Sequence, residues 1–185
     1  SAAQRKYSLA RTALYPSHAL VDPTLMLGKS RALTISTGLD ALSHALESLW
    51  NVRANPVSAA CAISAATEII SVLPKLADDL GSLELRSAMA RAALMAGMAF
   101  SNTKTAIAHA ISYPITLRHN VAHGIACSFS LPIVLASVAD DTGLDRKSTR
   151  LDSSHVVNSY AVFGLIKRTE EHTPGSGARS TPSTT

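Results

Sequence analysis

The sequence is poor in aromatic residues and in cysteine, and its glycines are scattered. Phe, Trp and Tyr make up 4% of the 185 residues, which disfavours a β-sandwich because strands are rich in aromatic and β-branched side chains. The two cysteines, Cys61 and Cys127, are too few for a disulfide framework, and we expect both to be free thiols in apolar helices. Neither is expected to have metal-ligand spacing to a histidine. The nine glycines form no loop of the kind that holds a dinucleotide at a helix N-terminus.

The sequence also lacks obvious membrane and targeting segments. No apolar run reads as long enough to cross a bilayer, and Ser1–Lys6 is not followed by the hydrophobic stretch of a signal peptide. We therefore expect no membrane partner and a cytoplasmic location.

The basic character of the chain, with a pI of about 9.3, comes mostly from its end. Residues 146–185 contain six Lys and Arg against three Asp and Glu, whereas residues 1–145 contain 11 against 10. The earlier part has no basic stripe interleaved with aromatic residues, so we expect no nucleic-acid partner. Residues 146–185 also contain 13 Ser and Thr and lose helical periodicity, which predicts a disordered or non-native tail.

Alanine and helical periodicity are abundant, so we expect a mainly α-helical bundle. Asn55, which precedes a proline, is a good helix N-cap. Its helix is expected to end near Leu73, because Pro74 follows. Ser82 is expected to cap the next helix, and Pro114 to stop a later one.

Four residues, Asp40, His44, His109 and His123, have the types and spacing of a metal site. Asp40 and His44 lie four residues apart in a stretch of helical periodicity, so one helical face presents both. His109 lies in a second apolar run, and His123 follows fourteen residues later. Three imidazoles and one carboxylate suit iron(II) or zinc and leave open positions for water or substrate. Taken alone, the first pair has a simpler alternative, a hydrogen-bonded pair on a helix surface.

These residues and their surroundings resemble the C-terminal helical domain of the iron-containing alcohol dehydrogenases. The resemblance runs from near Leu14 to near Asp140. The types, order and spacing of the ligands agree with the family in these segments: Thr37–Glu47, His109, His123-Gly124 and Leu131-Pro132. It implies that the four residues above bind iron, or sometimes zinc. It also implies a helical bundle like that of dehydroquinate synthase-like proteins, preceded by a short strand. The family's separate N-terminal dinucleotide-binding domain has no counterpart in this sequence.

The resemblance divides the chain into three parts. Residues 1–36 are expected to form the leading strand and connector, residues 37–145 a truncated helical metal-binding domain, and residues 146–185 the tail. An intact family member transfers hydride between a small alcohol or aldehyde and NAD(P), with the metal polarising the substrate oxygen. By this resemblance the chain is a fragment of such an oxidoreductase and is inactive alone. Self-association into a homo-oligomer is left open.

Two other interpretations also remain open. In the first, the chain is a non-catalytic metal-binding helical remnant or an interaction module. The missing cofactor domain favours this interpretation. Kinship with glycerol dehydrogenase or dehydroquinate synthase, which share the architecture, fits the ligand set less well.

Two residues are candidates for proton transfer, and none is assigned to NAD(P). Many family members have a histidine one turn after the third ligand, where this chain has Tyr113. A phenol is a poor base at neutral pH, so a pocket wall is the favoured alternative for it. His119 is a candidate to line the pocket or take up a proton, against the alternative of a solvated loop histidine. Glu47 is a candidate to orient the imidazole of His44, with a solvent-facing side chain as the alternative.

Overall fold

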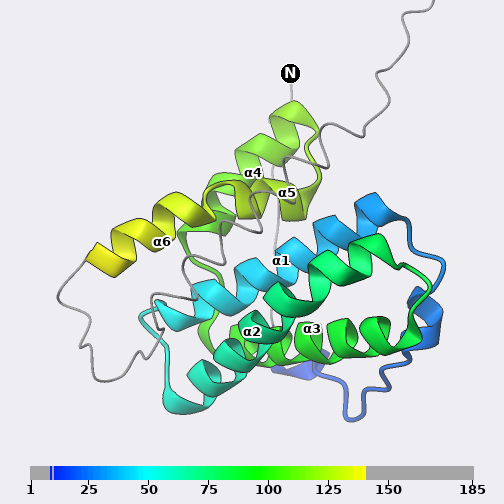
Figure 1. Ribbon diagram of the computed structural model, residues 1–185. Coiled ribbons are helices and arrows are strands. Elements are labelled where there is room, and N and C mark those ends of the chain that lie inside the picture. Colours follow the sequence, from blue (N-terminus) through cyan, green and yellow to red (C-terminus); the bar gives the residue numbers. More distant parts are fainter. Residues whose placement is uncertain (1–8, 10, 141–185) are drawn as a thin grey trace, which may run out of the picture.

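The structure, a computed structural model, describes residue 9 and residues 11–140, except for the side chains of residues 139 and 140. Its helices follow one another in this order (Figure 1): η1 (Thr12–Leu14), η2 (Pro23–Met26), α1 (Arg31–Leu49), α2 (Pro56–Asp78), α3 (Leu83–Thr103), α4 (Ile107–His119), α5 (His123–Phe129) and α6 (Leu131–Asp140). The η elements are short 3-10 helices. The described part is therefore mainly α-helical, as the sequence predicted.

Helix α1 lies at the centre of the fold. Helices α2 and α3 pack against one side of it, and α5 packs against another (Figure 1). A helix that is buried on most faces belongs in the interior, and α1 has twelve buried residues: Thr34, Ile35, Ser36, Gly38, Leu39, Ala41, Leu42, Ser43, Ala45, Leu46, Glu47 and Ser48. Gly38 permits the close contact with α2, because a Cβ atom there would lie 2.6 Å from Cδ1 of Leu73.

Side-chain caps begin the three helices α1, α2 and α3, which we call the bundle. Ser30 Oγ accepts a hydrogen bond from the backbone N–H three residues later (3.3 Å), and Ser82 Oγ does the same for α3 (3.2 Å). Asn55 forms a reciprocal capping box with Ser58 at the start of α2. The helix starts predicted at Asn55 and Ser82 are confirmed.

The two prolines predicted to limit helices do not do so. Pro74 lies inside α2 and Pro114 inside α4. Proline removes one helical hydrogen bond, but in α2 the neighbouring Leu73 and Leu76 are buried in the core, and their packing keeps the helix continuous. Helix α4 ends instead where Asn120 takes up a left-handed conformation, with φ of 53°.

The predicted leading strand is not found in residues 9 and 11–36, the described part of that segment. Helices η1 and η2 lie there instead, and α1 already begins at Arg31. A strand needs a neighbour to pair its backbone groups, and the described residues contain no other strand. Asp22 instead caps η2 by accepting the backbone N–H of Thr24 (2.9 Å). The predicted tail, residues 146–185, lies outside the described residues.

Helix α2 contradicts the expectation that no segment is apolar enough to cross a bilayer. It is 23 residues long, and its most apolar window has a mean hydropathy of 1.6. The same helix contributes one face to the core that it shares with α1 and α3, including Ala65, Ile69, Leu73 and Leu76. Its apolar composition therefore has a source within the fold.

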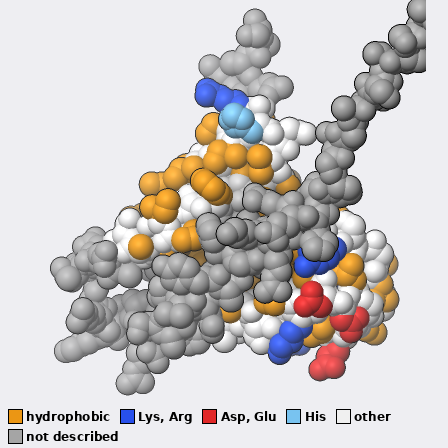
Figure 2. All heavy atoms as spheres, turned by 45° about the horizontal axis from the view of Figure 1, so that its top comes forward, with side chains coloured by type: hydrophobic (Ala, Val, Ile, Leu, Met, Phe, Trp, Pro, Cys, Tyr) orange, Lys and Arg blue, Asp and Glu red, His pale blue; other side chains and the backbone are white. Residues whose placement is uncertain are grey.

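Helices α4, α5 and α6 lie across α1 from α2 and α3 (Figure 1). Helix α5 approaches α1 closely at Gly124, where a Cβ atom would lie 1.8 Å from the carbonyl oxygen of Ser36. Figure 2 shows hydrophobic side chains gathered on the upper part of the visible face and acidic side chains at its lower right. Helices α4 to α6 expose these large apolar side chains: Ile107, Ile111, Leu117, Phe129 and Ile133.

Candidate metal centre

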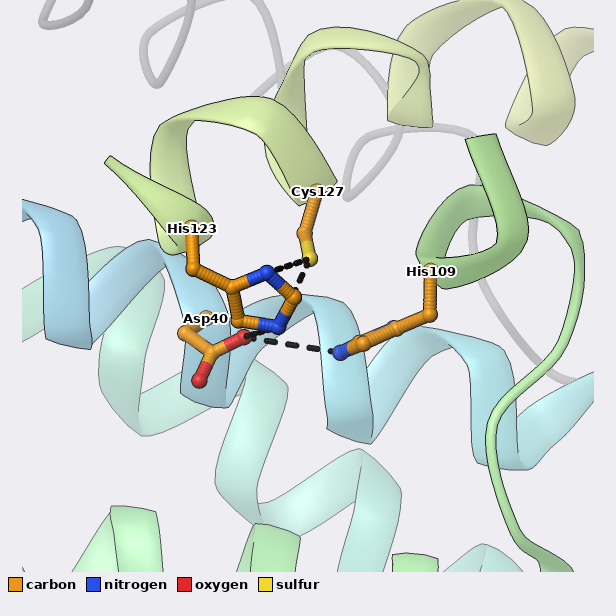
Figure 3. Close-up of side chains that lie close together, drawn as sticks. All are labelled: Asp40, His109, His123 and Cys127. Carbon is orange, nitrogen blue, oxygen red and sulfur yellow. Dashed lines mark hydrogen bonds and ion pairs between the residues drawn. The ribbon is translucent and has the colours of Figure 1, made fainter. Parts of the chain in front are cut away.

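The fold brings the four sequence-predicted ligands together around the carboxylate of Asp40. Oδ1 of Asp40 lies 3.4 Å from Nε2 of His109 and 3.8 Å from Nε2 of His123, and its Oδ2 lies 3.7 Å from Nε2 of His44. Asp40 and His44 project from one face of α1, one turn apart, while His109 lies in the first turn of α4 and His123 begins α5. Figure 3 shows the side chains of Asp40, His109 and His123 pointing toward one another from these three helices.

Individual polar atoms of Asp40, His44 and His109 lack ordinary hydrogen bonds. Oδ1 of Asp40, Nδ1 of His44 and Nε2 of His109 are all buried without a hydrogen-bond partner among the described residues. Leaving a buried polar atom unsatisfied costs about 1–3 kcal/mol, so Asp40 Oδ1 and His109 Nε2, which lie 3.4 Å apart, call for another partner. A cation fits these two atoms, because each has a lone pair when the carboxyl is ionised and His109 is neutral with its proton on Nδ1.

Two histidines of the group have opposite pKa shifts. Burial lowers the pKa of His44 to about 4, since desolvation of the imidazolium outweighs the attraction of Asp40. Burial also favours neutral His109, but its contacts with Asp40, Cys127 and Glu47 outweigh that effect and raise its pKa to about 11. For Asp40, burial acts to raise the pKa, and the nearby imidazoles of His109, His44 and His123 lower it overall. The site therefore provides a neutral ligand in His44 and a strong preference for positive charge at His109.

Glu47 holds His109 in place. This carboxylate is fully buried, and its Oε2 lies 2.5 Å from Nδ1 of His109. Its Oε1 accepts the backbone N–H groups of Ala108 (2.6 Å) and His109 (3.3 Å). Helix α4 has no capping side chain of its own at Ala106, so Glu47 caps α4 from α1. With Nδ1–H donated to Glu47, Nε2 of His109 is the ring nitrogen that faces Asp40, and it has a lone pair for a metal once its own proton is displaced.

The role of Glu47 differs from the one that sequence reasoning offered. It orients His109 on a different helix, whereas the sequence suggested His44 or solvent. Its spacing in α1 placed it one turn beyond His44, but nothing in the sequence showed that α4 would begin against it. Glu47 stays ionised although it is buried. Burial acts to raise its pKa, and the hydrogen bond with His109 lowers it overall.

Cys127 belongs to the same cluster of donor atoms. It is fully buried one turn after His123, and its Sγ lies 3.5 Å from Nε2 and 3.7 Å from Nδ1 of that histidine. The ligand atoms of Asp40, His109, His123 and Cys127 all lie within 4.8 Å of one another. The expectation that neither cysteine has metal-ligand spacing is wrong for Cys127. The signal was present in the sequence, because His123 and Cys127 repeat the four-residue spacing of Asp40 and His44. Both cysteines are free thiols, as predicted.

The two candidate proton carriers lie in different surroundings. The ring of Tyr113 is nearly parallel to that of His123, with an interplanar angle of 8° and centroids 6.1 Å apart. His119 is exposed in the last turn of α4. It lies ten residues beyond His109, which is about 15 Å along a helix axis. The structure thus brings Tyr113 to the ligands and leaves His119 away from them.

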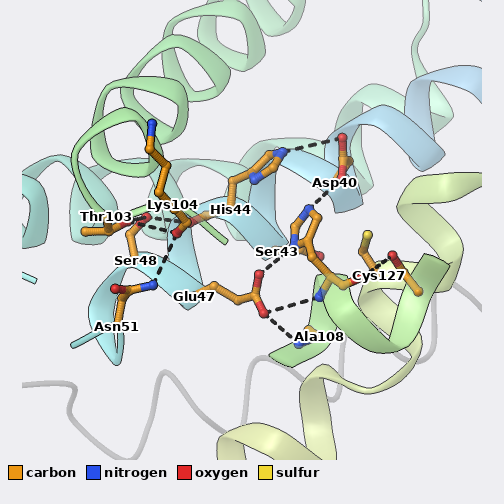
Figure 4. A network of polar contacts seen from close by, with 12 residues as sticks. Asp40, Ser43, His44, Glu47, Ser48, Asn51, Thr103, Lys104, Ala108 and Cys127 are labelled. Carbon is orange, nitrogen blue, oxygen red and sulfur yellow. Dashed lines mark hydrogen bonds and ion pairs between the residues drawn. The ribbon is translucent and has the colours of Figure 1, made fainter. Parts of the chain in front are cut away.

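A polar network fixes the connection between α3 and α4 (Figure 4). Lys104 ends α3 with a positive φ of 73°, a strained conformation for a residue other than glycine. Its carbonyl oxygen accepts a hydrogen bond from Asn51 Nδ2 (3.3 Å), and the hydroxyl of Thr103 lies within hydrogen-bond distance of both that oxygen (3.1 Å) and Ser48 Oγ at the end of α1 (3.1 Å). The start of α4, and with it His109, is therefore held against α1 at two points, this connection and Glu47.

Comparisons with known proteins point to one family. A sequence model described as "Fe-containing alcohol dehydrogenase family, C-terminal" matches residues 34–169, a range that extends past residue 145. The NAD-dependent methanol dehydrogenase of Bacillus methanolicus is 41% identical over 136 residues, which cover 74% of this chain and 36% of that protein. The phosphonoacetaldehyde reductase of Streptomyces viridochromogenes is 38% identical over 128 residues, covering 69% of this chain and 32% of that protein.

Solved structures agree with these sequence matches. The crystal structure of sulfoacetaldehyde reductase from Bifidobacterium kashiwanohense in complex with NAD+ superimposes with a TM-score of 0.75 at 31% identity. The aligned region covers 84% of this chain and 43% of that one. The chain therefore spans less than half the length of each of these three relatives.

Proposed function

The chain belongs to the Fe-containing alcohol dehydrogenase family, and from this membership we propose that it supplies the metal centre of an enzyme that interconverts small alcohols and aldehydes with NAD(P). The relatives' names support the substrate class, since they include a methanol dehydrogenase and two aldehyde reductases. The NAD-dependent relative and the structure in complex with NAD+ support the cofactor. The nicotinamide-binding part is expected in the share of the relatives' length that this chain does not span.

One observation carries the metal part of the proposal. Atoms from three helices converge on Asp40, and Oδ1 of Asp40 and Nε2 of His109 are buried there without hydrogen-bond partners. We assign Asp40, His44, His109 and His123 as ligands of iron(II) or zinc, ions that such nitrogen and oxygen donors suit. A divalent ion held there supplies Lewis-acid polarisation of a substrate oxygen.

The chain's own residues set the conditions for this chemistry. Glu47 fixes the ring of His109 and, in the neutral ring, favours the tautomer with its proton on Nδ1, which leaves the lone pair of Nε2 for a metal. The charge of Asp40 would offset part of the charge of a bound ion. Tyr113, stacked on His123, forms one wall beside the ligands, where its hydroxyl is the candidate to pass a proton between substrate and solvent. His119 is too far along α4 to act on a substrate at the ligands without an intervening relay.

Elemental analysis of the purified 185-residue chain tests the metal assignment. We expect about one iron or zinc per chain in the wild type and almost none in the Asp40→Ala, His123→Ala double variant. His18→Ala is the control, because His18 is exposed in the segment before α1. Equal metal content in wild type and the double variant would refute the site.

Activity tests the oxidoreductase part. Metal-loaded chain is incubated with NAD or NADP and a panel of primary alcohols, alone and together with a separately expressed nucleotide-binding half of a relative. We expect NADH or NADPH only in the mixture, because hydride transfer needs the nicotinamide held about 3–3.5 Å from the substrate carbon. Robust activity of the chain alone would show that it does not need a separate nicotinamide-binding part.

A further inference from the structure

We propose that Cys127 binds the metal directly through its sulfur, alongside Asp40, His109 and His123. This inference rests on the metal centre proposed above and extends it to a residue outside the Asp and three-His set. The motivating observation is the position of Sγ in the compact group of donor atoms, all within 4.8 Å of one another (Figure 3).

Three of the six separations among the four donor atoms have the lengths expected around one small ion. Zinc binds sulfur at about 2.3 Å and nitrogen or oxygen at about 2.0–2.2 Å, so donors around a tetrahedral ion lie about 3.3–3.8 Å apart. The distance from Cys127 Sγ to His123 Nε2 is 3.5 Å, from His123 Nε2 to Asp40 Oδ1 3.8 Å, and from Asp40 Oδ1 to His109 Nε2 3.4 Å. These three edges already have the lengths that a shared ion requires.

A simple thiol–imidazole hydrogen bond explains the geometry less well. Sγ of Cys127 lies at nearly equal distances from the two ring nitrogens of His123, 3.5 and 3.7 Å. A directed hydrogen bond would place the sulfur on the lone-pair axis of one nitrogen, clearly nearer to it than to the other. Nε2 of His109, which is buried without a hydrogen-bond partner, faces the same region from α4. This unpartnered nitrogen is a separate indication that a metal ion binds here.

The arrangement also gives His44 a distinct position. Its Nε2 faces Oδ2 of Asp40, whereas His109 and His123 face Oδ1. An ion bound to Oδ1 would therefore lie close to Cys127 as well as to His109 and His123, whereas His44 lies beside the other oxygen of Asp40. Binding forms a metal–sulfur bond and releases the thiol proton to solvent, with no electron transferred. Because thiolate is a soft ligand, Cys127 shifts the preference of the site toward zinc over iron(II).

Cobalt(II) loading of the full chain tests the inference with a spectroscopic readout. We expect visible ligand-field bands together with a near-ultraviolet thiolate-to-cobalt charge-transfer band. Cys127→Ala should lose the charge-transfer band and keep the ligand-field bands. The matched control is Cys61→Ala in α2, the other cysteine of the chain, which should keep both.

Each alternative outcome is decisive. Ligand-field bands without a charge-transfer band in the wild type would overturn the role of Cys127 and leave the proposed metal centre standing. A charge-transfer band that persists in Cys127→Ala would also overturn it. Absence of cobalt binding in the wild type would overturn both the inference and the metal centre.

X-ray absorption of the zinc-loaded wild type removes any dependence on the folding of a variant. We expect one sulfur scatterer at about 2.3 Å in addition to nitrogen and oxygen at about 2.0–2.2 Å. A shell of nitrogen and oxygen alone would contradict the inference.

Discussion

The bundle and the α4–α5 unit are held together by different forces. Among the described residues the main hydrophobic cluster has 18 buried members, of which only Ala108 and Leu131 come from α4 to α6. Helices α4 and α5 are joined to α1 instead by Glu47, by the close approach at Gly124 and by the candidate ligands. Hydrophobic packing therefore builds the bundle, whereas buried polar contacts and the close approach at Gly124 position the candidate site against α1.

Gly124→Ala should break the seating of α5 while sparing the bundle. The new Cβ would lie 1.8 Å from a backbone oxygen of Ser36, which cannot move like a flexible side chain, so α5 must shift away from Asp40. We expect zinc affinity, measured by competition with a chelating dye, to fall by more than the roughly 10–100-fold typical of changing a ligand's hydrogen-bond partner.

Gly97→Ala is the control for this change. A Cβ atom at Gly97 in α3 would have nothing within 4 Å, so this variant should bind zinc normally and gain up to about 1 kcal/mol of stability from helix propensity. Equal zinc affinities for the two alanine variants would show that α5 is not seated through Gly124.

Leu73→Ala should weaken the bundle and spare the site. Leu73 is 1% exposed in the core, so its truncation is expected to lower the free energy of unfolding by about 2–5 kcal/mol. Chemical denaturation measures this, with the half-exposed Leu83→Ala as a near-neutral control. A loss of zinc affinity in the folded variant as large as that of Gly124→Ala would argue against two separable regions.

Glu47→Gln should loosen the link between the regions without removing a ligand. The neutral amide no longer stabilises the Nδ1–H of His109 as a carboxylate does, and we expect zinc affinity to fall about 10–100-fold. Glu68→Gln is the control, since Glu68 pairs with Arg91 between α2 and α3 and does not touch the site. An unchanged affinity in Glu47→Gln would remove its positioning role.

The number of protons released on zinc binding should distinguish His109 from His44. With pKa values of about 11 for His109 and about 4 for His44, zinc binding at pH 8 displaces a proton from the first and none from the second. Calorimetry in buffers of different ionisation enthalpy should report about one proton, released by His109, in Cys127→Ala.

The sign of the His109 shift has a second consequence. In the metal-free protein its raised pKa stabilises the fold below the ordinary histidine value, and this contribution is lost as pH rises toward about 11. Metal affinity changes in the opposite direction over the same range, because fewer protons compete. Absence of proton release in Cys127→Ala would show that His109 is already neutral.

Local signals in the sequence were sufficient for part of this structure. Caps such as Asn55 and Ser82 act within one helix, so their positions could be predicted. The four-residue spacing of Asp40 and His44 likewise fixed a shared helical face.

Features that depend on tertiary contacts could not be predicted in the same way. Pro74 remains inside α2 because its neighbours are buried, and Glu47 reaches α4 only because that helix begins beside α1. Cys127 has a local signal, but a four-residue spacing to a histidine acquires meaning only when Asp40 and His109 arrive from other helices.

We propose that a bound metal joins α4 and α5 to the bundle. Hydrogen–deuterium exchange of the full chain, with one equivalent of zinc and with a chelator, measures this joining. We predict that zinc slows exchange in residues 107–129 and leaves residues 56–103 nearly unchanged. Equal exchange with and without zinc in both regions would show that no metal holds α4 and α5 to the bundle.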